Sequence, residues 1–177
     1  MTRKERVVHV RWRSHLGTLV WVLMVLAGAH VWHTRDVPSG PAPGFEALAV
    51  SAQDGALLSL AQWRTAHPGQ PVALHFWAEW CPVCKLEQGN ITAVAADWPV
   101  LTVAMRSGDV AAVRRVLAQR ALAWPTVVDA DGAVAARYGL HAVPAFVVID
   151  PAGRLRASSV GYTTEIGMRL RLWWAGL

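Results

Sequence analysis

Residues 75–85 read HFWAEWCPVCK and contain both cysteines of the 177-residue chain. Cys81 and Cys84 form a C-x-x-C pair between an apolar run typical of a buried strand and a segment with a helical pattern. A C-x-x-C pair that opens a helix after a strand has the geometry of a redox dithiol. Because the sequence has no third cysteine, neither sulfur has another partner in the chain, and a four-thiolate zinc site is excluded.

The two cysteines are expected to play different roles. Cys81 falls in the first turn of the predicted helix, where unpaired backbone N–H groups and the helix dipole favour a thiolate. Pro82 suits the first helical position, which needs no N–H donor. Cys84 lies about one turn further on, so it is expected to be the more shielded sulfur and to resolve a mixed disulfide between Cys81 and a substrate. The alternative is a stable structural disulfide or two inert thiols, although so short a loop stabilises a fold little.

The composition describes a globular chain with a basic N-terminal end. The apolar fraction of 54% is enough for a packed core. Of the net charge of +5, +4 comes from residues 1–37. The remainder of the chain is nearly neutral, so its charge gives no reason to propose a nucleic-acid partner.

The N-terminal segment has the pattern of a membrane anchor. Residues 16–32 contain no Asp, Glu, Lys or Arg and follow a basic stretch. We expect a basic cytoplasmic tail at 1–15, a transmembrane signal-anchor at 16–34 and export of the remaining chain. The alternative is a cleaved secretory signal, since residues 27–29 read Ala-Gly-Ala. Both alternatives place the dithiol outside the cytoplasm, where disulfides persist.

The remaining sequence predicts a linker at 35–44, rich in Pro and Gly, and one α/β domain at 45–177. Strands are predicted at residues 45–50, 56–60, 72–77, 100–105, 126–128, 145–149 and 155–161. Helices are predicted at residues 61–67, 82–98, 110–122, 133–138 and 163–175, the last with Ile166, Leu170 and Trp173 on one face. Strands that alternate with helices predict a central sheet with helices on both faces.

Several stretches resemble a known family. Residues 76–85, FWAEWCPVCK, resemble the active-site stretch of thioredoxins, with Pro-Val between the cysteines in place of Gly-Pro. The resemblance covers about residues 45–177. Within it, three parts resemble the membrane-anchored TlpA-like branch: the hairpin expected from the strands at 45–50 and 56–60, the additional segment 124–138, and the run YGLHAVPAFVVID at 138–150. Two further runs are most similar to the suppressor-of-copper-sensitivity D type: VAMRSGD at 103–109 and GMRLRLW at 167–173.

This resemblance implies a three-layer α/β/α thioredoxin-like fold with a mixed central sheet, an N-terminal β-hairpin and a central insertion, preceded by one transmembrane helix. It implies a protein disulfide oxidoreductase in the bacterial inner membrane, with its domain in the periplasm and protein thiols and disulfides as substrates. A reductase of the cytochrome c maturation or copper-stress type is favoured, with electrons supplied by a membrane partner of the DsbD type. No metal and no cofactor beyond the Cys81–Cys84 disulfide are expected.

The resemblance also assigns residues around the dithiol. Val143–Pro144 is expected to be a cis peptide bond facing the cysteines, with the Val143 backbone available to a substrate strand, whereas the residues alone favour trans. Trp80 offers substrate an apolar contact. His75 stands where thioredoxins carry a buried Asp that moves a proton to the second cysteine, and Glu87 stands where TlpA-like proteins carry an acid. The alternatives are a core histidine at position 75 and a solvated helix charge at position 87.

Two other functions compete with the reductase. One is an oxidant that donates disulfides, and the other is a copper-binding module, because two thiolates suit Cu(I). Against the copper module, five of the seven histidines lie away from the cysteines: His9, His15, His30, His33 and His67. Attachment of c-type haem is excluded because Lys85, not a histidine, follows Cys84.

Overall fold

The computed structural model describes residues 15–22, 24–25, 28, 39–50 and 56–177. The chain divides into two compact units, Met1–Arg35 and Asp36–Leu177. In the first unit, all the described residues are helical. None of the helices in the described part of the chain is long and apolar enough to cross a membrane. The rest of the segment predicted as an anchor lies outside the described residues, so the anchor stays a prediction.

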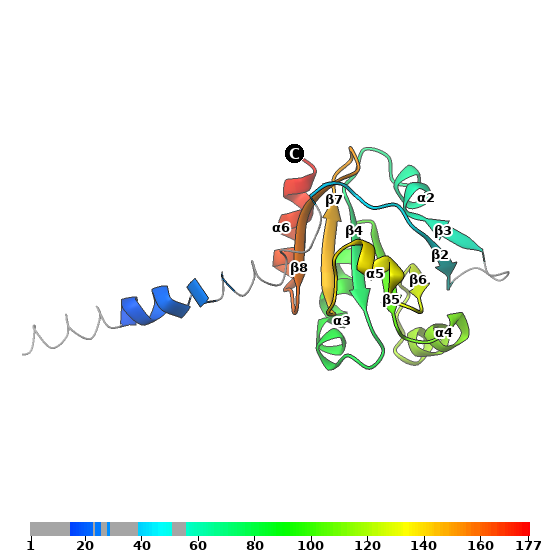
Figure 1. The fold of residues 1–177 in the computed structure, drawn as a ribbon, viewed down its shortest axis with the longest axis horizontal. Coiled ribbons are helices and arrows are strands. Elements are labelled where there is room, and N and C mark those ends of the chain that lie inside the picture. The colour runs from blue at the N-terminus through cyan, green and yellow to red at the C-terminus, as the bar shows by residue number, and fades with distance from the viewer. Residues whose placement is uncertain (1–14, 23, 26–27, 29–38, 51–55) are drawn as a thin grey trace, which may run out of the picture. The chain divides into compact units, whose positions relative to one another are not determined.

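The described part of the second unit is built on one mixed sheet with the strand order β1-β8-β7-β4-β5-β6-β2-β3 (Figure 1). β4 pairs in parallel with β5, and β5 pairs in parallel with β6, while all other neighbours are antiparallel. The strands are β1 (Gly40–Pro41), β2 (Glu46–Ala49), β3 (Leu57–Ser59), β4 (Val72–Trp77), β5 (Val100–Met105), β6 (Thr126–Asp129), β7 (Ala145–Ile149) and β8 (Arg154–Val160).

Helices cover both faces of this sheet, as the sequence predicts, and produce the three layers of a thioredoxin-like fold. One core cluster joins the sheet to α3 (Pro82–Ala95), α4 (Val110–Gln119) and α6 (Glu165–Ala175). A second cluster on the opposite face joins the sheet to α2 (Leu60–Thr65) and α5 (Ala133–Arg137). The predicted helices and strands are therefore present, with ends that differ by a few residues.

The central strands are buried on both faces, which explains their unbroken apolar sequences. Every residue of β4 and β5 is buried. Two polar residues interrupt these runs, and the register places them side by side, His75 beside Thr102. Thr102 hydrogen-bonds to Thr126 on β6 at 2.7 Å between their hydroxyl oxygens, whereas His75 points into the layer that contains α3. The sheet thereby places one unpaired polar side chain beneath the helix that carries the cysteines.

The predicted central insertion supplies β6 and α5. β6 lies between β5 and the antiparallel β2–β3 hairpin, so it attaches the hairpin to the sheet. Asp129 at the end of β6 caps α5, because its carboxylate accepts hydrogen bonds from the backbone N–H groups of Val134 and Ala135 at 3.0 and 2.9 Å. The expected turn of the hairpin at residues 51–55 lies outside the described residues.

The predicted linker differs from the structure in its second half. Gly40 and Pro41 form β1 at the sheet edge and pair with β8. Ala42 N–H donates to Gly153 O at 2.9 Å, and Tyr138 Oη donates to Pro43 O at 2.7 Å. An edge strand needs hydrogen-bond partners on one side only and therefore tolerates proline. The segment rich in Pro and Gly belongs to the domain from Gly40 onward.

We predict that Tyr138→Phe lowers the free energy of unfolding by about 1–2 kcal/mol, because it leaves the Pro43 carbonyl without its donor. The Tyr138 side chain is fully buried, and burial raises its pKa, so the hydroxyl remains a donor. Urea unfolding of the full chain with its disulfide intact measures the effect. Tyr162→Phe is the matched control: it removes the same atom from a half-exposed ring, where water can replace the Tyr162 hydroxyl as the acceptor of its hydrogen bond from Asn90, and it should change stability by less than about 0.5 kcal/mol. Equal stability of the two variants would contradict the assignment.

Candidate active site

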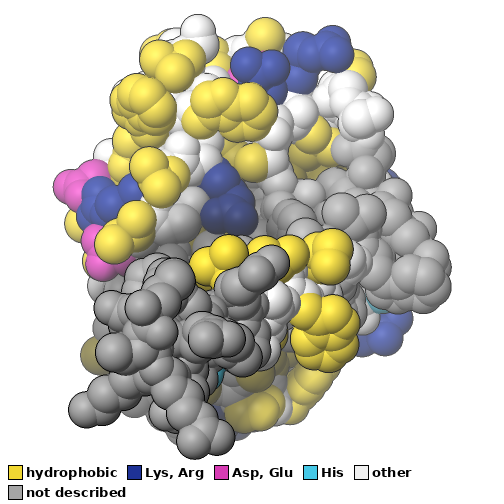
Figure 2. All heavy atoms as spheres, turned by 90° about the vertical axis from the view of Figure 1, so that its left-hand side faces the viewer, with side chains coloured by type: hydrophobic (Ala, Val, Ile, Leu, Met, Phe, Trp, Pro, Cys, Tyr) yellow, Lys and Arg dark blue, Asp and Glu magenta, His cyan; other side chains and the backbone are white. Residues whose placement is uncertain are grey.

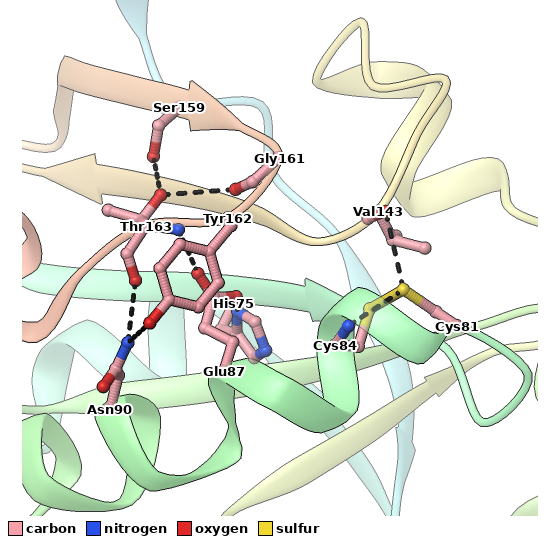
Figure 3. A network of polar contacts seen from close by, with 10 residues as sticks. All are labelled: His75, Cys81, Cys84, Glu87, Asn90, Val143, Ser159, Gly161, Tyr162 and Thr163. Atoms are coloured by element: carbon pink, nitrogen blue, oxygen red, sulfur yellow. Dashed lines mark hydrogen bonds and ion pairs between the residues drawn. A yellow bond between two sulfur atoms is a disulfide. The ribbon is translucent and has the colours of Figure 1, made fainter.

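The two cysteines lie at the junction between β4 and α3. Cys81 caps the helix with an extended backbone (φ −82°, ψ 112°), and Pro82 is the first helical residue, as predicted. Cys81 and Cys84 form a disulfide, with their Cα atoms 5.3 Å apart. The Cys84 backbone N–H donates to Cys81 Sγ at 3.1 Å (Figure 3). The cap of α3 is therefore a sulfur atom in the place usually taken by an oxygen.

This position favours negative charge on Cys81 once the disulfide opens. The Cys84 N–H points at Cys81 Sγ, and the aligned peptide dipoles of α3 add a partial positive charge at the same end. The sequence also predicted that Cys84 would be the more shielded sulfur. The two residues are in fact almost equally buried, with 3% and 2% of their surfaces exposed. The helix position, rather than exposure, distinguishes the two sulfurs.

A backbone carbonyl faces Cys81 from the loop before β7. The Val143–Pro144 peptide bond is cis, as the resemblance predicts, and it directly precedes β7. The Val143 carbonyl oxygen lies 3.6 Å from Cys81 Sγ (Figure 3). Because β7 pairs with β4, residues distant in sequence meet at the sulfur.

The loop before Cys81 is held by contacts that the sequence did not reveal. Glu79 N–H donates to Ser107 Oγ at 3.0 Å, and the Arg120 guanidinium donates to Glu79 O at 3.1 Å. The Trp80 indole N–H donates to Arg106 O at 3.1 Å while the ring remains 60% exposed. Arg106 and Ser107 follow β5, whose parallel pairing with β4 brings them to the site, and Arg120 ends α4. Trp80 therefore presents a positioned apolar surface beside the dithiol.

His75 and Glu87 form a buried pair beneath the helix. Both side chains are fully buried, so the interpretation of Glu87 as a solvated charge is wrong. Glu87 Oε1 accepts a 2.6 Å hydrogen bond from Thr163 N–H, and Glu87 Oε2 lies 3.9 Å from His75 Nδ1 (Figure 3). Within the described residues, neither ring nitrogen of His75 nor Glu87 Oε2 has a hydrogen-bond partner. Such unpaired buried atoms are rare in structural cores.

Burial shifts the two pKa values in opposite directions, and both shifts favour the neutral form. Burial lowers the pKa of His75 from 6.5 to about 3. The backbone of Ala145 opposes this shift, although it makes no hydrogen bond of standard geometry with the ring. Burial raises the pKa of Glu87 from 4.5 to about 7, against the opposing Thr163 N–H. At neutral pH the histidine is uncharged, and the carboxyl is close to its midpoint. The two side chains therefore do not form an ion pair, and only Glu87 titrates near neutral pH.

A polar network links this pair to the turn before α6. The Asn90 side-chain amide, about one turn after Glu87, donates to Tyr162 Oη and to Thr163 O, both at 3.1 Å (Figure 3). Thr163 Oγ1 and Ser159 Oγ share a 2.9 Å hydrogen bond. The sequence carried no signal for the contacts of Tyr162 and Thr163, which lie 72 positions from Asn90 and 76 positions from Glu87, respectively. The network fixes the acid of the candidate site against the β8–α6 turn.

Fold and site together define the class of protein, a thioredoxin-like protein with a C-x-x-C pair at the start of a helix. The chain belongs to the AhpC/TSA family, whose model matches residues 38–158.

Proteins that are similar to this chain in sequence or in structure agree with this class. A thioredoxin-like protein of Haemophilus influenzae is 31% identical over 107 residues, which cover 60% of this chain and 64% of that protein. A thiol:disulfide interchange protein DsbE homolog of Paracoccus denitrificans is 32% identical over 82 residues, or 46% of each chain. The crystal structure of a secreted Mycobacterium tuberculosis disulfide oxidoreductase is 28% identical and has a TM-score of 0.59, over 73% of this chain and 95% of that one. The chain spans about half to two thirds of the length of the curated relatives.

The raised pKa of Glu87 predicts an unusual pH dependence of stability. The unfolded chain loses the Glu87 proton near pH 4.5 and the folded chain near pH 7, so the folded state loses stability as pH rises through this window. Glu87→Gln removes this dependence. Between pH 4.5 and pH 7.5 the variant should gain about 3 kcal/mol relative to the parent.

Urea unfolding of both proteins across this pH range measures the difference. The lowered pKa of His75 acts in the opposite sense. Its contribution to the stability of the folded state is present above pH 6.5 and is lost as pH falls toward 3. It is common to both proteins and largely cancels in the comparison. Glu46→Gln, on the exposed side of β2, is the control and should follow the parent. A difference between Glu87→Gln and the parent that stays constant with pH would show that Glu87 does not titrate in this window.

Proposed function

We propose that this protein exchanges disulfides with protein substrates through Cys81 and Cys84. The observation that carries the proposal is the position of Cys81 Sγ, which receives the Cys84 N–H at the start of α3 and faces the Val143 carbonyl. The helix start thus stabilises the thiolate form of Cys81, which is the form that attacks a disulfide. The Val143 backbone beside the sulfur can pair with an extended peptide.

In the reducing direction, the Cys81 thiolate attacks one sulfur of a substrate disulfide. That disulfide breaks, a Cys81–substrate disulfide forms, and the first substrate sulfur leaves as a thiolate. Cys84 then gives up its proton and attacks Cys81 Sγ, which releases the second substrate thiolate. The substrate gains two electrons, and the protein ends with the Cys81–Cys84 disulfide. The oxidising direction runs the same steps in reverse.

The surrounding residues have distinct parts in this proposal. An extended substrate segment pairs with the Val143 backbone beside Pro144 and contacts the exposed Trp80 ring. Glu87 lies one helical turn beyond Cys84, and its pKa of about 7 suits an acceptor of the Cys84 proton. His75 stays uncharged beside Glu87 and keeps the acid in a low-dielectric environment.

We further propose that the domain works outside the cytoplasm, anchored by residues 16–34, as a reductase of the cytochrome c maturation or copper-stress type. The uncharged apolar run after a basic tail supports the anchor. Similarity to DsbE proteins and to a secreted oxidoreductase supports export. A reductase in such a compartment needs electrons from the membrane, so a partner of the DsbD type is part of the proposal.

The reduction potential tests the direction of electron flow. We expect the full chain, equilibrated with glutathione or dithiothreitol buffers, to have a potential near or below about −200 mV. A value near about −120 mV would instead assign the protein as a disulfide donor. Fluorescence or thiol alkylation follows the redox state, and the Cys81→Ala/Cys84→Ala variant supplies the baseline.

Trapping tests the roles of the two sulfurs. Cys84→Ala should accumulate a mixed disulfide with a substrate through Cys81, because the resolving thiol is missing. Cys81→Ala is the matched control, and we expect at least about tenfold less trapped product. Non-reducing gels and mass spectrometry identify the linkage. Preferential trapping through Cys84 would reverse the assignment.

A further inference from the structure

Helix α6 exposes a continuous apolar stripe. Four large side chains of α6 and Leu177, two residues beyond its end, follow the helical spacings 4, 3, 1 and 3 and are between 50% and 80% exposed: Ile166, Leu170, Trp173, Trp174 and Leu177. The helix packs on the sheet through its other side, which buries Met168, Leu172 and Ala175. We call the five exposed residues the α6 stripe. A stripe this large on one helix is typical of a surface that meets an apolar phase or a partner.

Arginines border the tryptophan end of this stripe. The Arg156 guanidinium lies 5.2 Å from the centre of the Trp174 ring, and its Nε is 3.6 Å from Asp150. Arg154 is exposed two residues earlier on β8, and Arg171 lies on α6, where its guanidinium donates to Gly167 O at 2.8 Å. Figure 2 shows apolar side chains gathered on this face with basic side chains beside them. On the far side of α6, Arg169 is occupied by ion pairs with Asp97 and Glu165, which are 2.8 Å away.

The tryptophan end of α6 lies where the chain enters the domain. Gly40 pairs with Leu155, which pairs with Ile149 of β7, and Ile149 pairs with Val72 at the start of β4. The end of α6 reaches the same edge, because a Cβ on Gly176 would lie 3.6 Å from the ring of Pro71. The dithiol follows the opposite end of β4. The first strand of the domain, β1, therefore lies at the same edge as the arginines and the tryptophans of α6, and this edge is away from the cysteines.

The length of the connecting segment limits what this surface can reach. Under the proposed anchor, six residue steps separate Thr34 from Gly40, which spans at most about 20 Å. β1 and its neighbours β8 and α6 are then held close to the bilayer surface. Indole rings beside arginines are the side chains that membrane interfaces favour, and arginines are attracted to anionic headgroups.

We propose that the α6 stripe, with Arg154, Arg156 and Arg171, lies on the surface of an anionic lipid bilayer. The tether that favours this contact rests on the anchor in the proposed function. In this arrangement the dithiol stays clear of lipid, because Cys81 follows the end of β4 whereas the tryptophan end of α6 lies beside Pro71, before its start. The membrane contact orients the site toward protein substrates.

Quenching by lipids with brominated acyl chains tests this arrangement. The full chain is reconstituted, with its dithiol reduced, in vesicles of phosphatidylcholine and phosphatidylglycerol. The difference in tryptophan emission between the parent chain and Trp173→Phe/Trp174→Phe reports on the stripe. The same difference for Trp80→Phe reports on the dithiol end, and for Trp21→Phe on the proposed anchor. We expect brominated chains to reduce the stripe emission at least about twofold and to leave the Trp80 emission unchanged. Arg154→Glu/Arg171→Glu should weaken the stripe quenching, whereas Arg115→Glu on α4 should not.

Each outcome decides the proposal. Quenching at Trp21 without quenching at the stripe overturns the membrane contact and leaves the anchor intact. Quenching at the stripe without quenching at Trp21 supports the contact and removes the anchor. No quenching at either position rejects both, and equal quenching of Trp80 and the stripe rejects the orientation. Disulfide exchange measured on the same samples tests the redox function separately.

Discussion

The start of α3 at Cys81 is the constraint on which the site depends. A sulfur at the helix cap can receive the Cys84 N–H only if the helix begins directly after Cys81. Pro82 fits because the first helical residue has no intrahelical acceptor for an N–H. The burial of β4 between two helical layers fixes where the sulfurs lie, and β7 brings the Val143 carbonyl to them.

A second constraint is the full burial of two titratable side chains beneath this helix. His75 Nδ1 and Glu87 Oε2 lie 3.9 Å apart, yet burial favours the neutral form of each side chain. The Thr163 N–H holds one carboxylate oxygen and leaves the other without a partner. Because Thr163 also belongs to the turn that begins α6, the buried acid and the outer helix share a support.

The sequence predicted the helices and strands well, because each depends on nearby residues. The apolar runs of β4 and β5 indicate strands covered on both faces, and the C-x-x-C pair with Pro82 indicates a helix start. Glu87 was placed correctly along the chain, but its burial could not be predicted, since a glutamate on a helix is usually solvated. The place of Gly40 in the sheet was also missed, because Pro and Gly are typical of linkers as well as of edge strands.

The sequence by itself determined the fold class, the order of its elements and the cysteine that begins α3. Tertiary structure alone decided that Ser107 contacts the loop before Cys81 and that Thr163 contacts Glu87. It also decided that the α6 stripe faces outward. An apolar stripe on a helix has the same sequence pattern whether it faces the core or the surface. Strand pairing and packing between distant segments set these contacts, and local sequence does not encode them.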